Sequence, residues 1–257
     1  MVIEISEIGF GELFEGDCLE IMKNIPDKSI DMVLCDLPYG TTSCKWDTVI
    51  PFDVLWDQYN RISKDNAAIV LTAVQPFTSF VIMSNLNNFK YCWIWEKSSG
   101  TGFLDTKKRP LKCHEDVIVF YYKQPIYNPQ KWKGEPNHGC KTSVRKTKSV
   151  YAGDYGRPEP DISGMKYPRS VIKFKKHSSS ENLHTTQKPI ALFEYLIKTY
   201  TNEGALVLDN CAGSGTTGIA CLNTNRKFIL IEKEHEYVEI IKERIEKHLE
   251  EKKEIKE

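Results

Sequence analysis

Apolar positions fall into short runs that alternate along the chain with longer segments of mixed polarity. Runs of roughly four to eight residues rich in β-branched and aromatic side chains predict strands. Apolar residues repeating every three or four positions predict helices. The predicted strands cover residues 29–36, 67–73, 91–97, 115–122, 205–209 and 227–232. The predicted helices cover residues 51–63, 75–86, 191–200 and 234–256, and a Gly-rich turn opens a further helix within residues 210–222.

Signals at helix ends sharpen this pattern. Asp17 followed by Glu20 predicts a capped helix start with a capping box. Pro189 can occupy the first turn of the helix over 191–200, which we expect to end near Gly204.

The alternation predicts an α/β fold with a doubly wound, mostly parallel, Rossmann-like sheet across a single domain, residues 1–257. Between about 124 and 180 the apolar periodicity is lost, and Pro, Gly, Asn, Lys and Arg dominate. Aromatic residues are interleaved there, so we interpret the segment as an insertion instead of a linker. Ligands of such sheets bind beyond the carboxyl ends of the strands. The segments 36–42 and 209–218, together with Glu232, are predicted to lie there.

Composition narrows the class of protein. The 257 residues include 40% apolar residues, enough for a core, and no stretch reaches the roughly 18 apolar residues of a membrane span. The acidic N-terminus has no basic region typical of a signal peptide, so we expect a cytoplasmic protein. Eight cysteines lack the C-x₂₋₄-C spacing of zinc sites. We therefore predict free thiols and no metal site.

The segment 209–218 is a Gly-rich turn, G-x-G-x-x-G, between a predicted strand and a predicted helix. Glycines let a ligand approach the backbone, and Glu232 at the end of the next strand can accept hydrogen bonds from ribose hydroxyls. An adenosine-containing ligand is the prediction. In proteins that bind a nicotinamide cofactor, this motif is expected in the first strand–helix unit, whereas here it lies near the end of the chain. Asp209, expected at the mouth of the site, suits a ligand ammonium, so S-adenosylmethionine fits best.

The segment Asp36-Leu37-Pro38-Tyr39 groups a carboxylate, a rigid turn and an aromatic ring after a strand. An exocyclic aromatic amine is weakly basic because its lone pair is delocalised. A carboxylate and a backbone carbonyl that accept its N–H groups would make it a better nucleophile. Asp36, the Leu37 carbonyl and the Tyr39 ring can fill these roles.

Four motifs in this order resemble S-adenosylmethionine-dependent amino-group DNA methyltransferases, which act on adenine N6 or cytosine N4. The motifs are DLPYG (36–40), HTTQKP (184–189), VLDNCAGSGTT (207–217) and the acid of FILIE (228–232). Their order resembles the permuted β class, and several stretches are similar to phage and prophage adenine-N6 enzymes. Many members of the family have Pro where this chain has Leu37.

The resemblance implies roles for individual residues. His184 and Lys188 match the segment that closes over the methionine end, with Lys188 facing its carboxylate. Asp17 and Cys18 match a segment that touches the cofactor's adenine. The implied cofactor-binding set is Asp17, Cys18, Asp36, His184, Lys188, Asp209, Cys211, Ala212, Gly213, Ser214, Gly215, Thr216 and Glu232.

Charge is segregated along the chain. It sums to zero overall, but residues 1–60 hold 12 acids against three lysines, and residues 130–177 hold 12 basic residues against four acids. The basic segment predicts target recognition on double-stranded DNA, whose target base must be flipped out. The residues expected to contact DNA are Lys45, Lys107, Lys108, Arg109, Lys131, Lys133, Arg145, Lys146, Lys148, Arg157 and Arg169.

Alternatives stay open at this point. The same chemistry could act on cytosine N4, on RNA or on a protein glutamine amide. A non-catalytic DNA-binding regulator would keep the fold, and a nicotinamide oxidoreductase is a more distant reading. The resemblance also suggests a homodimer and leaves open a cognate restriction endonuclease.

Overall fold

The computed structural model of the chain describes residues 4–8, 10–40, 47–134, 164–175 and 187–254. The chain forms two compact units. The larger comprises Met1–Asn128 with Ser170–Glu257, and the smaller comprises Pro129–Arg169.

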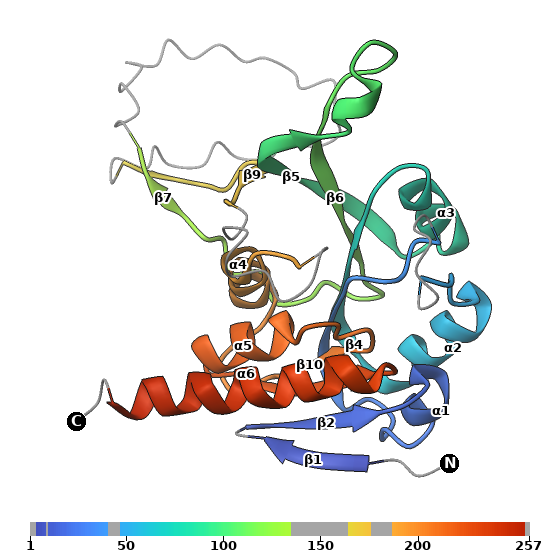
Figure 1. Cartoon of the computed structure of the whole chain (residues 1–257), viewed down its shortest axis with the longest axis vertical. Helices are drawn as coiled ribbons and strands as arrows, with labels where there is room; N and C mark the ends of the chain where they lie inside the picture. Colours follow the sequence, from blue (N-terminus) through green and yellow to red (C-terminus); the bar gives the residue numbers. More distant parts are fainter. Residues whose placement is uncertain (1–3, 9, 41–46, 135–163, 176–186, 255–257) are drawn as a thin grey trace, which may run out of the picture. The chain divides into compact units, whose positions relative to one another are not determined.

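The larger unit is built on a mixed, mostly parallel sheet (Figure 1). Its order over the described residues is β1-β2-β11-β10-β3-β4-β6-β5-β9. β2, β11, β10, β3 and β4 are parallel, whereas β6 is antiparallel to both β4 and β5. The predicted α/β sheet is thus confirmed. The strands are β1 (Glu4–Ile8), β2 (Gly11–Glu15), β3 (Ile30–Cys35), β4 (Ser63–Ala73), β5 (Phe89–Thr101), β6 (Lys112–Phe120), β9 (Val171–Lys173), β10 (Leu206–Asp209) and β11 (Lys227–Glu232).

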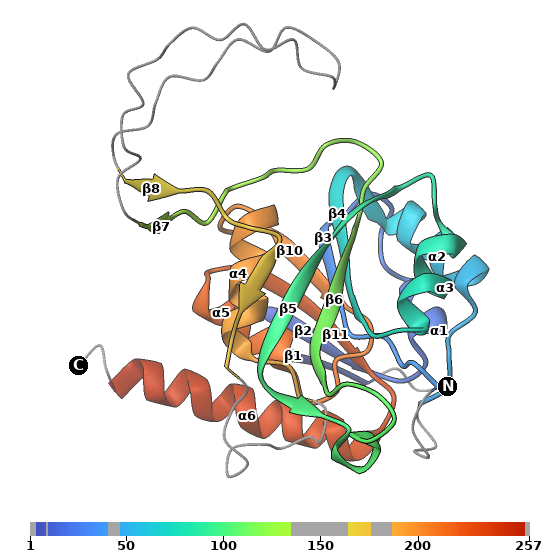
Figure 2. The same ribbon diagram turned by 90° about the horizontal axis from the view of Figure 1, so that it is seen from above.

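Helices cover both faces of the sheet (Figure 2). In β3, Met32 and Leu34 pack on the side of α4, α5 and α6, while Val33 and Cys35 pack on the side of α1, α2 and α3. A strand buried on both faces is apolar throughout, which explains its continuous apolar run. Within the described ranges, no helix is both long and apolar enough to span a bilayer. The helices are α1 (Cys18–Met22), α2 (Phe52–Ile62), α3 (Phe77–Ser84), α4 (Ile190–Tyr200), α5 (Thr216–Asn223) and α6 (His235–Glu254).

The N-terminal region departs from the sequence prediction. Strands β1 and β2 form an antiparallel hairpin that the apolar pattern did not predict. The capping box at α1 was also wrong. The Asp17 carboxylate accepts a hydrogen bond from Leu19 N at 2.9 Å, but Glu20 pairs with Lys23 at 2.7 Å. An exposed lysine one turn away competes for the Glu20 carboxylate.

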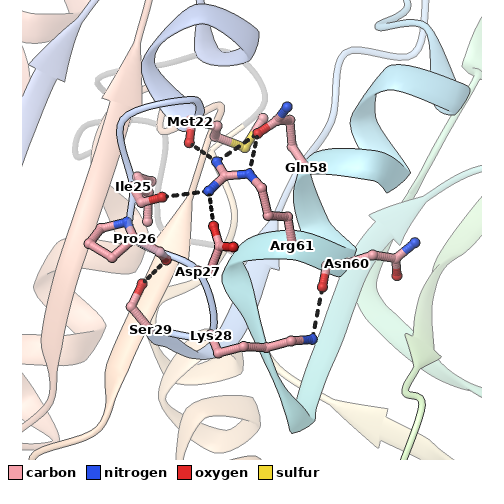
Figure 3. Close-up of polar contacts among 9 residues, drawn as sticks. All are labelled: Met22, Ile25, Pro26, Asp27, Lys28, Ser29, Gln58, Asn60 and Arg61. Carbon is pink, nitrogen blue, oxygen red and sulfur yellow. Dashed lines mark hydrogen bonds and ion pairs between the residues drawn. The ribbon is translucent and has the colours of Figure 1, made fainter.

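Arg61, at the end of α2, fastens the connection between α1 and β3 (Figure 3). Its guanidinium donates to the carbonyl oxygens of Met22 and Ile25 at 2.6 and 2.8 Å, and it pairs with Asp27 at 2.6 Å. The Met22 carbonyl also accepts a hydrogen bond from Ile25 N at 3.1 Å, so the guanidinium adds a second donor there and reaches a carbonyl beyond the helix end at Ile25. This connection leads directly into β3 and the residues that follow it.

The smaller unit contains a short antiparallel pair, β7 (Trp132–Lys133) with β8 (Met165–Lys166). Lys131 Nζ lies 4.3 Å from the centroid of the Tyr167 ring. Strand β9 falls within the segment 124–180 that was predicted as an insertion, yet it pairs with β5 in the main sheet. The prediction that this segment recognises the target falls mostly outside the described residues.

Candidate active site

Three acidic residues meet at the carboxyl ends of neighbouring parallel strands. Glu232 ends β11, Asp209 ends β10, and Asp36 directly follows β3. The strand order reverses between β10 and β3, which is where doubly wound sheets bind ligands. A cavity of about 550 Å³ lies here, lined by these acids and by Lys188. Its volume falls within the range of small-molecule sites.

The Asp36 carboxylate is held by three side chains. The Tyr39 hydroxyl donates to Oδ1 at 2.5 Å, the Thr72 hydroxyl donates to the same oxygen, and Lys188 Nζ lies 2.5 Å from Oδ2. Burial and the nearby Asp36 charge raise the pKa of Tyr39 well above its usual value. The phenol therefore stays protonated and remains a donor. The structure thus brings together Asp36, Tyr39 and Lys188.

The turn after Asp36 is anchored on both sides. The Leu37 side chain is buried in the core beneath α1, α2 and α3. The Tyr39 ring packs on Phe77 with ring centroids 5.0 Å apart. Gly40 adopts a φ of 67° and donates its N–H to Asp47 Oδ1 at 2.8 Å. The side chain of Leu37 therefore anchors the turn in the core.

Lys188 belongs to a buried network of ion pairs in which acidic and basic side chains alternate. Glu115 Oε2 lies 3.4 Å from Lys188 Nζ, and the other Glu115 oxygen pairs with Lys97. Burial opposes the charge of Lys188, but Asp36, Tyr39 and Glu115 together raise its pKa well above the usual value. Burial likewise opposes ionisation of Glu115, yet the two lysines lower its pKa. The lysine and glutamate side chains are therefore charged at neutral pH.

The conformation of the Gly-rich turn depends on two glycines and on hydrogen bonds to the Asp209 carboxylate. Gly213 and Gly215 have positive φ values of 52° and 76°, a conformation that favours glycine. Asp209 is 3% exposed instead of lying at the mouth of the site as predicted. Its carboxylate accepts hydrogen bonds from Cys211 N at 3.1 Å and Thr217 Oγ1 at 2.5 Å. Burial raises the pKa of Asp209 to about 6.

Other residues of the Gly-rich turn form hydrogen bonds with residues outside it. Ala212 N donates to Ile231 O at 3.0 Å, and Arg244 of α6 donates to Ser214 O at 2.7 Å. Thr216 begins α5 and is buried. Ala212, Ser214 and Thr216 also line the cavity.

Glu232 joins β11 to the Gly-rich turn. Its Oε2 accepts a hydrogen bond from Gly213 N at 2.7 Å, and its Oε1 accepts from Lys233 N and Glu234 N at 2.8 and 2.9 Å. Burial raises the pKa of this carboxyl, while the backbone donors oppose that shift. Glu232 therefore orders the turn, and it also lines the cavity.

Residues at the junction between β2 and α1 also line the cavity. Gly16 N donates to Glu232 O at 2.9 Å, which ties the end of β2 to the end of β11. Asp17 and Cys18 line the cavity, and a hydrogen bond with the Cys211 thiol lowers the pKa of Cys18. The predicted adenine-binding pair therefore lies beside the Gly-rich turn.

The predicted DNA-contacting residues divide into three groups. Lys107, Lys108 and Arg109 are exposed in the turn between β5 and β6. Lys131, Lys133 and Arg169 are exposed on the smaller unit. The third group lies outside the described residues: Lys45, Arg145, Lys146, Lys148 and Arg157. His184, which was predicted to bind the cofactor, also lies outside them.

The sequence analysis missed several residues that hold the site. Asp47 reaches it from a nearby loop, whereas Thr72 and the Lys97–Glu115 pair reach it from positions far along the chain. Lys97 had a detectable signal, because it continues the alternate positions of Trp93 and Trp95 on the buried face of β5. A charge on the buried face of a strand indicates a partner within the core.

Comparison with known proteins identifies the family. The profile of the N6_N4_Mtase family, described as DNA methylase, matches residues 30–243 of this chain. The matched range contains Asp36, Lys188, Asp209 and Glu232.

Two curated relatives resemble the chain over most of its length. The type II methyltransferase M.HpaI of Haemophilus parainfluenzae is 28% identical over 245 residues, covering 89% of this chain and 72% of the relative. The DNA adenine methyltransferase YhdJ of Escherichia coli (strain K12) is 27% identical over 247 residues, covering 89% and 80%.

Two solved structures share the fold. The complex of M1.HpyAVI with SAM matches with a TM-score of 0.64 and 24% identity, covering 91% of this chain and 98% of that one. The cytosine-N4-specific PvuII DNA methyltransferase matches with a TM-score of 0.66 and 18% identity, covering 94% and 92%. With the family match over residues 30–243, the chain belongs to the N6/N4 DNA methylase family.

Proposed function

We propose that this chain transfers a methyl group from S-adenosylmethionine to adenine N6 at a specific site in duplex DNA, after the target base is flipped out of the helix. The observation that carries the proposal is the Asp36 carboxylate, fixed by Tyr39, Thr72 and Lys188 inside the same cavity as the Gly-rich turn.

The cavity fits S-adenosylmethionine in size and chemistry. Its volume of about 550 Å³ suits a nucleoside joined to an amino acid. The Glu232 carboxylate can accept hydrogen bonds from ribose hydroxyls, and the buried Lys188 ammonium can pair with a carboxylate. Asp17 and Cys18 lie beside the turn, where an adenine would sit. When bound, S-adenosylmethionine supplies a methyl group already activated on a sulfonium.

Asp36 and its turn then act on the amine. Asp36 Oδ2 accepts one N–H of the exocyclic amine, and the Leu37 carbonyl accepts the other. The lone pair is thereby directed toward the methyl group, and the reaction depends mainly on in-line positioning and exclusion of water. The Tyr39 ring, backed by Phe77, provides a flat surface for the base.

Before Asp36 Oδ2 can accept the N–H of the amine, its ion pair with Lys188 Nζ must break. A ligand carboxylate offers its ammonium another anion, and Glu115 at 3.4 Å keeps it in place during the exchange. The catalytic carboxylate is therefore neutralised by an internal cation until a ligand carboxylate competes for that cation.

Mass spectrometry of nucleosides after incubation with labelled S-adenosylmethionine tests the proposal. We expect labelled N6-methyladenine from duplex DNA. The isosteric variant Asp36→Asn should bind S-adenosylmethionine yet transfer no methyl group. A wild-type chain that binds the cofactor and methylates no DNA would contradict the proposal.

The same experiment decides between related acceptors. The structural likeness to a cytosine-N4-specific enzyme makes N4-methylcytosine the principal alternative product. Parallel incubations with structured RNA would reveal an RNA substrate. Sequencing of methylated DNA from cells that express the chain would identify the recognition site.

A further inference from the structure

The turn between β5 and β6, residues 102–111, displays apolar side chains to solvent. Leu104 is 102% exposed and Phe103 is 68% exposed, and Leu104 is the most exposed large apolar side chain in the described part of the chain. The turn lies at the free end of a long hairpin that projects beyond the sheet (Figures 1 and 2). Exposed apolar groups grouped in this way indicate a contact with a partner.

The turn is ordered by its own backbone. Gly102, with a φ of 94°, introduces a 3₁₀ turn over Phe103–Asp105. The Asp105 carbonyl accepts hydrogen bonds from Lys108 N at 2.8 Å and Arg109 N at 3.0 Å. Phe103 and Leu104 are thus presented in a defined arrangement, which lowers the entropy lost when they bind.

The charges around this apolar tip favour a polyanion. Lys107, Lys108, Arg109 and Lys112 are exposed, and Asp105 is paired with Arg109. A tip that combines apolar side chains with cations matches the wedges that separate stacked bases while neighbouring cations contact phosphates.

The same hairpin also forms part of the candidate active site. Lys97 and Thr101 of β5 and Glu115 of β6 line the cavity. Leu104 lies three residues beyond Thr101, so the chain can separate them by no more than about 10 Å. A duplex that delivers a base to the cavity would therefore lie within reach of the tip.

We propose that Phe103 and Leu104 enter the DNA helix beside the target base and hold the space that the flipped base leaves. This inference rests on the proposed function. Lys107 and Lys108 then contact the flanking phosphates. The tip lowers the cost of flipping, so it acts on the paired duplex before the chemical step.

Methyl transfer by the double variant Phe103→Ala with Leu104→Ala tests this role. On a normally paired duplex we expect kcat/KM to fall by about 10- to 100-fold, since unstacking is no longer compensated. On a duplex with an abasic site opposite the target, activity should recover to near wild type, because the base is already free to leave. The matched control Leu86→Ala removes another exposed leucine outside this hairpin and should change neither rate.

Three results would overturn the wedge: wild-type rates for the double variant on the paired duplex, an equal loss on both duplexes, or the same loss in Leu86→Ala. Binding of S-adenosylmethionine, followed by calorimetry, should be unchanged in all variants. Failure of the proposed function itself would look different, because the wild-type chain would then methylate neither duplex.

Discussion

Lys188 Nζ lies 2.5 Å from Asp36 Oδ2 and 3.4 Å from Glu115 Oε2, so one buried ammonium joins the turn after β3 to strand β6. Removing it should leave two carboxylates without their shared cation. We expect Lys188→Met to lower the free energy of unfolding by about 3 kcal/mol, measured by urea denaturation, and to abolish binding of S-adenosylmethionine.

A second substitution separates these two effects. Lys188→Met combined with Glu115→Gln returns the net charge of the cluster to zero, and the amide oxygen introduced by Glu115→Gln can still accept a hydrogen bond from Lys97. Stability should largely recover, whereas cofactor binding should not. Recovery of both would mean that Lys188 has only a structural role.

Tyr39 combines a ring that packs on Phe77 with a hydroxyl that donates to Asp36. Tyr39→Phe keeps the ring, and Thr72 and Lys188 still hold the carboxylate, so single-turnover methyl transfer should fall less than about tenfold. Tyr39→Ala removes the stacking surface, which is worth about 1–3 kcal/mol, so the rate should fall by about 5- to 150-fold. Equal rates for the two variants would contradict a role for the ring.

What the sequence could predict depended on how local each feature is. Asp36 and Tyr39 lie three residues apart after an apolar run, so their grouping was visible in one segment. The Gly-rich turn was visible for the same reason. Thr72, Lys97 and Glu115 reach the site only because β4, β5 and β6 pair with one another, and strand pairing across that distance has no local signature. The β1–β2 hairpin was missed because its strands are short and partly acidic.

Arg61 stabilises the connection into β3 through contacts that a lysine cannot reproduce. The guanidinium reaches Met22 O, Ile25 O and Asp27 at once (Figure 3), whereas a lysine ammonium lacks this planar fork. We expect Arg61→Lys to cost about 1–3 kcal/mol in urea denaturation, because the carbonyls of Met22 and Ile25 lose the hydrogen bonds that the guanidinium donates.

Lys28→Gln is the matched control for Arg61. Lys28 donates to Asn60 O at 3.0 Å and pairs with Asp65, but it is largely exposed. Its loss should cost well under about 1 kcal/mol. Similar losses for Arg61→Lys and Lys28→Gln would argue against a special role of the guanidinium.

Asp209 should make the stability of the protein depend on pH in an unusual direction. Burial raises its pKa to about 6 in the folded chain, against about 3.9 in an unfolded chain. Between these values the folded state binds the proton more tightly, so the contribution of this carboxyl to stability is largest below about pH 4 and declines as the pH rises through 6. At pH 7 the ionised carboxylate therefore costs up to about 3 kcal/mol.

Asp209→Asn tests this dependence because asparagine has nearly the same shape and does not ionise. The free energy of unfolding of the variant, minus that of the wild type, should increase by up to about 3 kcal/mol between pH 4 and pH 7. Asp65→Asn is the opposite control, since hydrogen bonds and charge from Lys123 and Lys28 lower the pKa of this exposed carboxyl. Its removal should matter least at low pH and should slightly destabilise the protein above about pH 4. A difference for Asp209→Asn that stays constant from pH 4 to pH 7 would show that Asp209 is already ionised throughout this range, and that the Gly-rich turn is ordered by a carboxylate whose charge burial does not oppose.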